Sequence, residues 1–173
     1  MTLWISLKDI PAEGQEFHFT DQSLWTGPMN DLGVSGKIGT PFAASMYITP
    51  QDEGFLISGS MTGSVVVPCD VCAEDFEQKV DTHFDSFEVA DLADDEYADE
   101  KRLRKDKHGN AELDVSGYLW EQFMLALPIR PVCRENCKGL CPVCGVNRNE
   151  VACECAGDKG DPRLAVLRKL KVS

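Results

Sequence analysis

The chain has 173 residues, and 43% of them are hydrophobic, which is enough for one folded core with a small appended module. Its formal net charge is −12, and no stretch approaches the roughly 18 apolar residues of a membrane span. The N-terminus has neither the basic start nor the apolar run of a signal peptide. We therefore expect a cytoplasmic protein without a membrane partner, whose thiols stay reduced rather than forming stable disulfides.

The charge is unevenly spread along the chain. Residues 1–100 carry 3 Lys and Arg against 20 Asp and Glu, a balance of −17, whereas residues 101–173 carry 14 against 9, a balance of +5. The negative net charge therefore excludes binding to bare nucleic acid through overall electrostatic attraction. Local RNA contact by the basic part stays open, and so does the simpler interpretation that both charge sets are solvated surface.

The first third of the chain gives weak signals. Residues 2–7 and 16–20 are short and apolar or alternating, which favours two strands. Residues 21–33 mix apolar side chains with turn formers, so a short helix or a loop is expected there.

The middle of the chain predicts an antiparallel meander of at least three strands. Alternating apolar side chains mark strands at 42–49, 55–67 and 76–84, with turns at 50–54 and 68–73. In the second strand the apolar face carries Phe55, Ile57, Met61, Val65 and Val67, opposite a row of Ser and Thr. Gly59 and Gly63 fall on that apolar face, which predicts a bend or a bulge.

The last part of the chain predicts helices around a cysteine-rich segment. Residues 91–112 lack periodicity and indicate a mobile charged connection. A helix is expected over 113–127, with Asp114 as its N-cap and Pro128 ending it. A final helix is expected over 161–171.

These elements predict an α+β fold: an antiparallel β-sheet meander or partial barrel with C-terminal helices and a small Cys-rich module like a zinc ribbon. The expected division is a β-rich body over 1–90, the mobile connection over 91–112, and the helix, Cys-rich module and terminal helix packing on the body over 113–173.

Six cysteines lie within the 23 residues from Cys133 to Cys155. The sequence CPVCG (141–145) is the most specific element, because two thiols two residues apart in a tight turn can bind one ion. A structural Zn²⁺ is the preferred interpretation, and free thiols or an iron–sulfur cluster are the alternatives. The expected ligands, in order of preference, are Cys141 and Cys144, then Cys137 and Cys153, then Cys155 and Cys133. Whether they form one site or two stays open, and about one zinc per chain is expected.

A second thiol pair, Cys69 and Cys72, lies in the predicted turn at 68–73. Redox catalysis is disfavoured, because no helix follows and the nearby carboxylates of Asp70, Glu74 and Asp75 are expected to raise the thiol pKa values. The pair is either a structural feature of the turn or part of a metal site with Cys133 and Cys137.

No catalytic constellation stands out. The histidines His18, His83 and His108 are scattered, and no phosphate loop or hydrolase motif is present. We therefore expect no enzyme and no small-molecule substrate. Candidate RNA contacts are basic residues in or after the cysteine segment: Lys138, Arg148, Arg163 and Arg168.

The order of motifs resembles the YceD family of bacterial proteins, linked to accumulation of large-subunit ribosomal RNA. The resemblance rests on VVVPCDVC, then LALPIRPVC, then CKGLCPVCG and finally DPRLAVL, and it is strongest from residue 114 to residue 171. It implies a cytosolic, non-enzymatic role in making or stabilising 23S ribosomal RNA, with ribosomal RNA or large-subunit ribosomal proteins as partners. Because some family members lack the C-terminal cysteines, this role does not depend on zinc.

Three functions therefore compete: a ribosome-assembly factor, a zinc-stabilised adaptor unrelated to ribosomes, and a CxxC thiol oxidoreductase.

Overall fold

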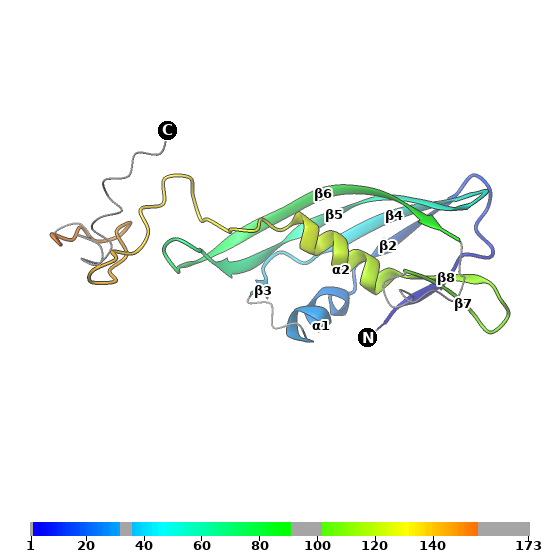
Figure 1. Ribbon diagram of the computed structural model, residues 1–173, viewed down its shortest axis with the longest axis horizontal. Coiled ribbons are helices and arrows are strands. Elements are labelled where there is room, and N and C mark those ends of the chain that lie inside the picture. Colours follow the sequence, from blue (N-terminus) through cyan, green and yellow to red (C-terminus); the bar gives the residue numbers. More distant parts are fainter. Residues whose placement is uncertain (1, 32–35, 91–101, 156–173) are drawn as a thin grey trace, which may run out of the picture.

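The computed structural model describes residues 2–31, 36–90 and 102–155. Its elements in chain order are β1 (Trp4–Ser6), β2 (Gln15–Phe19), α1 (Ser23–Asp31), β3 (Lys37–Ile38), β4 (Ala43–Gln51), β5 (Gly54–Pro68), β6 (Asp75–Val89), β7 (Leu103–Lys105), β8 (Ala111–Asp114) and α2 (Val115–Ala126). Two antiparallel sheets and the two helices make up the fold (Figure 1). The predicted α+β class is confirmed, and the sheets are open rather than closed into a barrel.

The larger sheet is built around β5. Its first part pairs with β4, residues Val65 and Val66 pair with the short β3, and its whole length pairs with β6. β2 completes the sheet on the far side of β4. The predicted meander is thus confirmed as β4, β5 and β6, because alternating side chains place one face of each strand in the core.

The glycines of β5 make room for aromatic rings. The pairing register runs without interruption through Gly59 and Gly63, so the predicted bulge is wrong. A Cβ atom at Gly63 would lie 2.5 Å from the ring of Phe42. A Cβ atom at Gly59 would clash with the backbone carbonyl oxygen of Ser45 and would lie 2.7 Å from the ring of Phe84. Glycine is therefore required at Gly63 by the Phe42 ring, and at Gly59 by the Ser45 carbonyl together with the Phe84 ring.

Both helices cover the inner face of the larger sheet (Figure 1). Trp25 of α1 stacks on Phe42 with ring centroids 5.3 Å apart, and Phe123 of α2 meets the edge of Phe42 at the same distance. These three side chains are almost fully buried. Phe42 therefore joins both helices to the sheet at the centre of the core.

The smaller sheet has the order β1, β8, β7. We expected a mobile connection over 91–112, but part of this range forms strands. β7 and β8 pair as a hairpin, and its Leu103 and Leu113 are buried. Two buried leucines separated by charged residues gave too little periodicity to reveal two strands of three and four residues. Residues 91–101 lie outside the described residues.

The helix α2 has the predicted boundaries within two residues. Asp114 caps it, because its side chain accepts a hydrogen bond of 3.0 Å from the N–H of Gly117. Leu127 is extended, as expected for a residue that precedes a proline. Within the described ranges, no helix has the length and apolar character that a membrane crossing requires. The helix predicted over 161–171 lies outside the described residues.

The β5–β6 hairpin extends past the end of β4 and carries the sequence CDVC at its tip. β4 pairs with β5 only as far as Thr62, whereas the β5–β6 pairing continues to Pro68 and Asp75. After α2 the chain runs along this hairpin toward its tip (Figure 1). The two cysteine-containing segments, distant in sequence, thereby meet at one end of the molecule.

Candidate metal centres

The eight cysteines gather in two groups of four. The first group is Cys69, Cys72, Cys133 and Cys137, and the second is Cys141, Cys144, Cys153 and Cys155. Within each group all four sulfur atoms lie within 4.8 Å of one another, and all eight cysteines are free thiols. The first group joins the tip of the β5–β6 hairpin to the segment after α2, whereas the second lies within 15 residues of chain.

This grouping differs from the preferred ligand order. The order placed Cys137 beside Cys141 and Cys144, but the structure places Cys133 and Cys137 with the pair in the hairpin tip. The alternative that joined those four cysteines agrees with the geometry. A shared Cys-x-Val-Cys pattern in CDVC and CPVC is the signal that could have favoured two equivalent half-sites.

The two Cys-x-Val-Cys turns share one pattern of backbone hydrogen bonds. In each turn the residue after the second cysteine donates its N–H to the carbonyl of the first, from Ala73 to Cys69 and from Gly145 to Cys141, both at 2.8 Å. The N–H of the first cysteine then donates to the carbonyl five residues on, at 2.9 and 2.8 Å. Ala73 and Gly145 both have positive φ, 62° and 73°. Such a turn directs both sulfurs to the same side.

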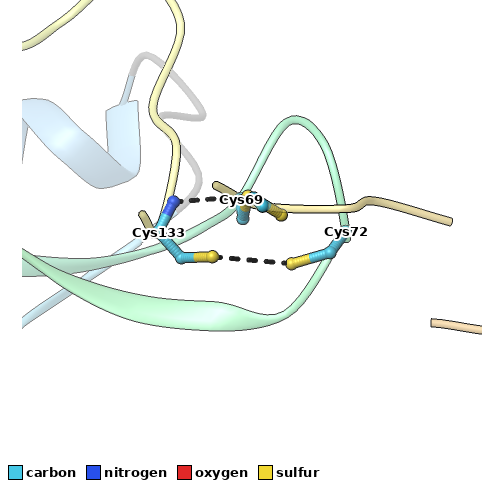
Figure 2. A group of neighbouring side chains, drawn as sticks. Cys69, Cys72 and Cys133 are labelled. Atoms are coloured by element: carbon cyan, nitrogen blue, oxygen red, sulfur yellow. Dashed lines mark hydrogen bonds between the residues drawn. The ribbon is translucent and has the colours of Figure 1, made fainter. Parts of the chain in front are cut away.

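N–H donors point at the sulfurs of the first group. The Cys69 sulfur accepts from the backbone N–H of Cys133 at 3.4 Å, drawn in Figure 2, and from that of Val71 at 3.5 Å. The side-chain amide of Asn149 donates to the Cys137 sulfur at 3.4 Å. Donors of this kind stabilise a thiolate, which is the form that binds a metal.

The sulfur separations fit a tetrahedral ion. Cys72 and Cys133 have sulfurs 3.8 Å apart (Figure 2), and those of Cys69 and Cys137 are 4.0 Å apart. A zinc–sulfur bond of about 2.3 Å in a regular tetrahedron places two sulfurs about 3.8 Å apart. A disulfide would require about 2.05 Å. The donor set and its spacing therefore fit a Cys₄ metal site.

Each group has one thiol with a strongly lowered pKa. Burial raises the pKa of Cys69, but N–H donors led by that of Cys133 outweigh it and bring the value to about 6. The N–H groups of Cys144 and Val143 bring the pKa of Cys141 to about 6 as well. The expectation that carboxylates raise the pKa of Cys69 is therefore wrong, because hydrogen bonds to its sulfur lower the pKa by more than burial raises it.

Four other thiols have raised pKa values, with neighbouring thiols among the causes: Cys72, Cys133, Cys153 and Cys155. The pKa of Cys137 is instead lowered, chiefly by the hydrogen bond from the Asn149 side chain. Burial and the hydrogen bond with Cys69 raise the pKa of Cys133 to about 12. The hydrogen bond with Cys144 and burial raise that of Cys155 to about 12. For Cys72 the N–H of Glu74 lowers the pKa, but burial and neighbouring thiols raise it more. Four thiolates in either group therefore require a cation between them.

Backbone contacts hold the hairpin tip against the segment after α2. The N–H of Asp70 donates to the carbonyl of Pro131 at 2.9 Å, and the N–H of Leu140 donates to that of Val71 at 3.0 Å. Gly139 is buried with φ of +69°, and a Cβ atom there would lie 2.7 Å from the Val71 carbonyl oxygen. Glycine is therefore required at this crossing, both for φ and for space.

Substituting Gly139→Ala is expected to weaken metal binding at the first group. A left-handed residue with a side chain costs about 1–2 kcal/mol, and the close approach to Val71 adds to this. We expect about tenfold weaker binding or more, measured by competition with a zinc chelator. Ala73→Gly is the matched control, because it relieves a positive φ and should leave the affinity nearly unchanged. Equal losses in both variants would contradict this account.

Asn149 lies between Cys144 and Cys153 in the chain and contacts the first group. Its side-chain oxygen accepts from the N–H of Lys138 at 2.9 Å, while its amide donates to the Cys137 sulfur. Beside it, the N–H of Arg148 donates to the carbonyl of Gly139 at 2.9 Å. Lys138 and Arg148, predicted as RNA contacts, are both exposed and line one pocket of about 330 Å³ together with Cys153 of the second group. The other two candidates, Arg163 and Arg168, lie outside the described residues.

The histidines stay apart from these groups. His18 lies in β2, His83 in β6 and His108 in the turn between β7 and β8. In the described part of the chain, cysteine is the only residue type in either metal-binding group.

The family comparison matches residues 57–171 to "Large ribosomal RNA subunit accumulation protein YceD". An uncharacterized protein of Mycobacterium bovis is 32% identical over 102 residues, which cover 58% of this chain and 48% of that protein. A protein of Zea mays named "Large ribosomal RNA subunit accumulation protein YCED homolog 1, chloroplastic" is 23% identical over 182 residues, covering 87% of this chain and 60% of that protein. The Arabidopsis thaliana protein of the same name is 22% identical over 158 residues, covering 77% of this chain and 49% of that protein.

No solved structure gives a significant match. The chain spans about half to three fifths of the length of these curated relatives. The family match covers the whole of both Cys-x-Val-Cys turns, the helix α2 and the segment that carries the remaining cysteines. The chain therefore belongs to the YceD family of large ribosomal RNA subunit accumulation proteins.

Proposed function

We propose that this chain is a non-enzymatic factor for the synthesis, processing or stability of large-subunit ribosomal RNA. The observation that carries the proposal is the family match over residues 57–171, since the family and the plant relatives are named for accumulation of that RNA. The partners in this proposal are 23S-type ribosomal RNA or large-subunit ribosomal proteins. The role is one of binding and assembly in a compartment where thiols stay reduced, such as the cytoplasm.

The proposal gives the cysteines a structural role with two zinc ions per chain. The sequence alone led us to expect about one. Support comes from two Cys₄ groups with sulfurs within 4.8 Å and N–H donors aimed at the first group. Bound zinc would supply four coordinate bonds to each group, which offsets the scarcity of large buried side chains in residues 129–155, the part after α2 that the structure describes. This also makes residues 129–155 a module that is separable from the β-rich body.

A thiol oxidoreductase is the alternative that one observation favours, because the pKa of Cys69 is lowered to about 6. A redox thiol must also be reachable, and Cys69 and Cys72 are each only 2% exposed. Backbone donors that lower a thiol pKa inside a closed Cys₄ group serve metal binding equally well. Geometry therefore supports the structural role over catalysis.

The role in ribosomal RNA is tested by depletion of the protein in cells. We expect mature large-subunit RNA to fall relative to small-subunit RNA, and re-expression of the wild-type chain to restore the ratio. An unchanged ratio would reject the proposal and favour an adaptor of another complex. Affinity capture with and without RNase separates the two functions, because a ribosomal factor retains large-subunit RNA or proteins in the eluate.

A further inference from the structure

Positive charge in the folded body is concentrated in the β7–β8 hairpin. Residues 1–90 contain only three Lys or Arg residues against 14 Asp or Glu residues, whereas four Lys and Arg residues lie between residues 102 and 107. Arg104, Lys105 and Lys107 are exposed. The hairpin projects at the end of the molecule opposite the cysteine segment (Figure 1). An anionic partner therefore meets its most favourable potential on the body here.

The loop between β7 and β8 is held in one shape by Asp106. Its carboxylate accepts hydrogen bonds from the N–H of His108 at 2.7 Å, from the N–H of Asn110 at 2.8 Å and from the Asn110 side chain at 2.9 Å. These bonds, led by that of the Asn110 side chain, lower the pKa of Asp106. Gly109 has φ of +82°, which closes the loop. The Asp106 carboxylate thus accepts hydrogen bonds from its own loop, while Lys107 and His108 are exposed at the tip of the hairpin.

Arg104 is held in place beside the loop. Its guanidinium carbon lies 3.7 Å from the centre of the Trp4 ring, and its Nε donates to Glu112 at 2.8 Å. The side chain remains 51% exposed, so its terminal N–H groups can reach an acceptor in solvent. A pocket of about 460 Å³ is lined by Arg104, Lys105, Asp106, Lys107, His108 and Glu112.

The cysteine segment is less suited to an anion. Residues 129–155 carry four Lys and Arg against three Asp and Glu. Each Cys₄ site with one Zn²⁺ adds a charge of −2, so the loaded segment becomes net negative. Lys138 and Arg148 therefore lie in a less favourable potential than the hairpin cations.

We propose that the β7–β8 hairpin binds the phosphate backbone of RNA through Arg104, Lys105 and Lys107. This inference rests on the proposed function, and it moves the main RNA contact from the predicted C-terminal residues to the body. The described residues provide no ion-pair partner for the ammonium groups of Lys105 and Lys107, and the Arg104 guanidinium is already held in place, so all three can donate to phosphate oxygens. Among the described residues, none of the large exposed apolar side chains lies between residues 102 and 110, which disfavours insertion into a membrane.

The test is binding of the zinc-loaded full chain to a large-subunit ribosomal RNA transcript over a series of salt concentrations. The variant Lys105→Ala/Lys107→Ala removes two exposed charges without touching Arg104, which packs on Trp4. Two lost phosphate contacts should reduce the slope of log K against log salt by about 1.4, or roughly 25-fold in affinity at 0.1 M salt. The matched control, Lys37→Ala/Lys79→Ala, removes the same charge from exposed positions of the larger sheet and should change binding little.

An unchanged slope in the hairpin variant, an equal loss in the control, or no RNA binding by the wild type would overturn the inference. Preferential binding of the hairpin to vesicles with anionic lipids would do so as well. Failure of the proposed function would be seen in a different measurement. Depletion of the protein would then leave the ratio of large-subunit to small-subunit RNA unchanged, whatever the hairpin variant binds.

Discussion

Removing metal from the first cysteine group is expected to free residues 131–155 from the hairpin tip while the larger sheet stays folded. The variant Cys72→Ser/Cys133→Ser deletes two of its four ligands. A structural zinc contributes about 10–16 kcal/mol to the ordering of its ligands, more than the few backbone hydrogen bonds across this contact can replace. Elemental analysis should find one zinc per chain instead of two. Hydrogen exchange should become fast at Asp70 and Leu140 and stay slow in β4 and β5.

The matched variant Cys141→Ser/Cys144→Ser deletes ligands of the second group. It should also lose one zinc, but the N–H of Asp70 should remain protected because the first group is intact. Loss of both metals in either variant would show that the two groups form one cooperative unit. Iron instead of zinc in the purified protein would contradict the metal assignment, and melting of the sheet would contradict the separation of module from body.

Substituting Phe42→Ala is expected to destabilise the body by about 3–5 kcal/mol. The ring is 1% exposed and contacts Trp25 of α1 and Phe123 of α2, so its removal leaves a cavity where both helices meet the sheet. A loss of this size is a large part of the total stability of a domain. Urea unfolding followed by tryptophan fluorescence should show a lower midpoint with a similar slope.

The control for this variant is Phe87→Ala, the same change on β6 at a ring that is 46% exposed. We expect its effect to stay within about 1 kcal/mol. In Phe42→Ala at a urea concentration that unfolds the body, one zinc should remain bound, since the second cysteine group needs only 15 residues of contiguous chain. A Phe87→Ala loss as large as that of Phe42→Ala would show that the outer face of the sheet is covered in solution.

Local patterns along the sequence predicted the elements that form through local contacts. Alternation in residues 55–67 marked β5 and the face it buries, because successive side chains of a strand point to opposite sides. Asp114 and Pro128 set the ends of α2, since a cap and a proline act on the backbone next to them. The short hairpin of β7 and β8 was missed, because β8 is stabilised by pairing with the distant β1, and neither strand has a hydrophobic pattern of its own.

By itself the sequence determined the antiparallel meander, the capped helix, the two Cys-x-Val-Cys turns and the family. Only the tertiary structure decided which cysteines share a site. Cys72 and Cys133 are 61 residues apart in the chain, and their sulfurs meet because the β5–β6 hairpin is long enough to carry its tip to the segment after α2. All cysteine side chains are chemically identical, so the sequence does not show which of them share a metal site. The length of the strands and the path of the chain determine which four sulfurs come close enough to bind one ion.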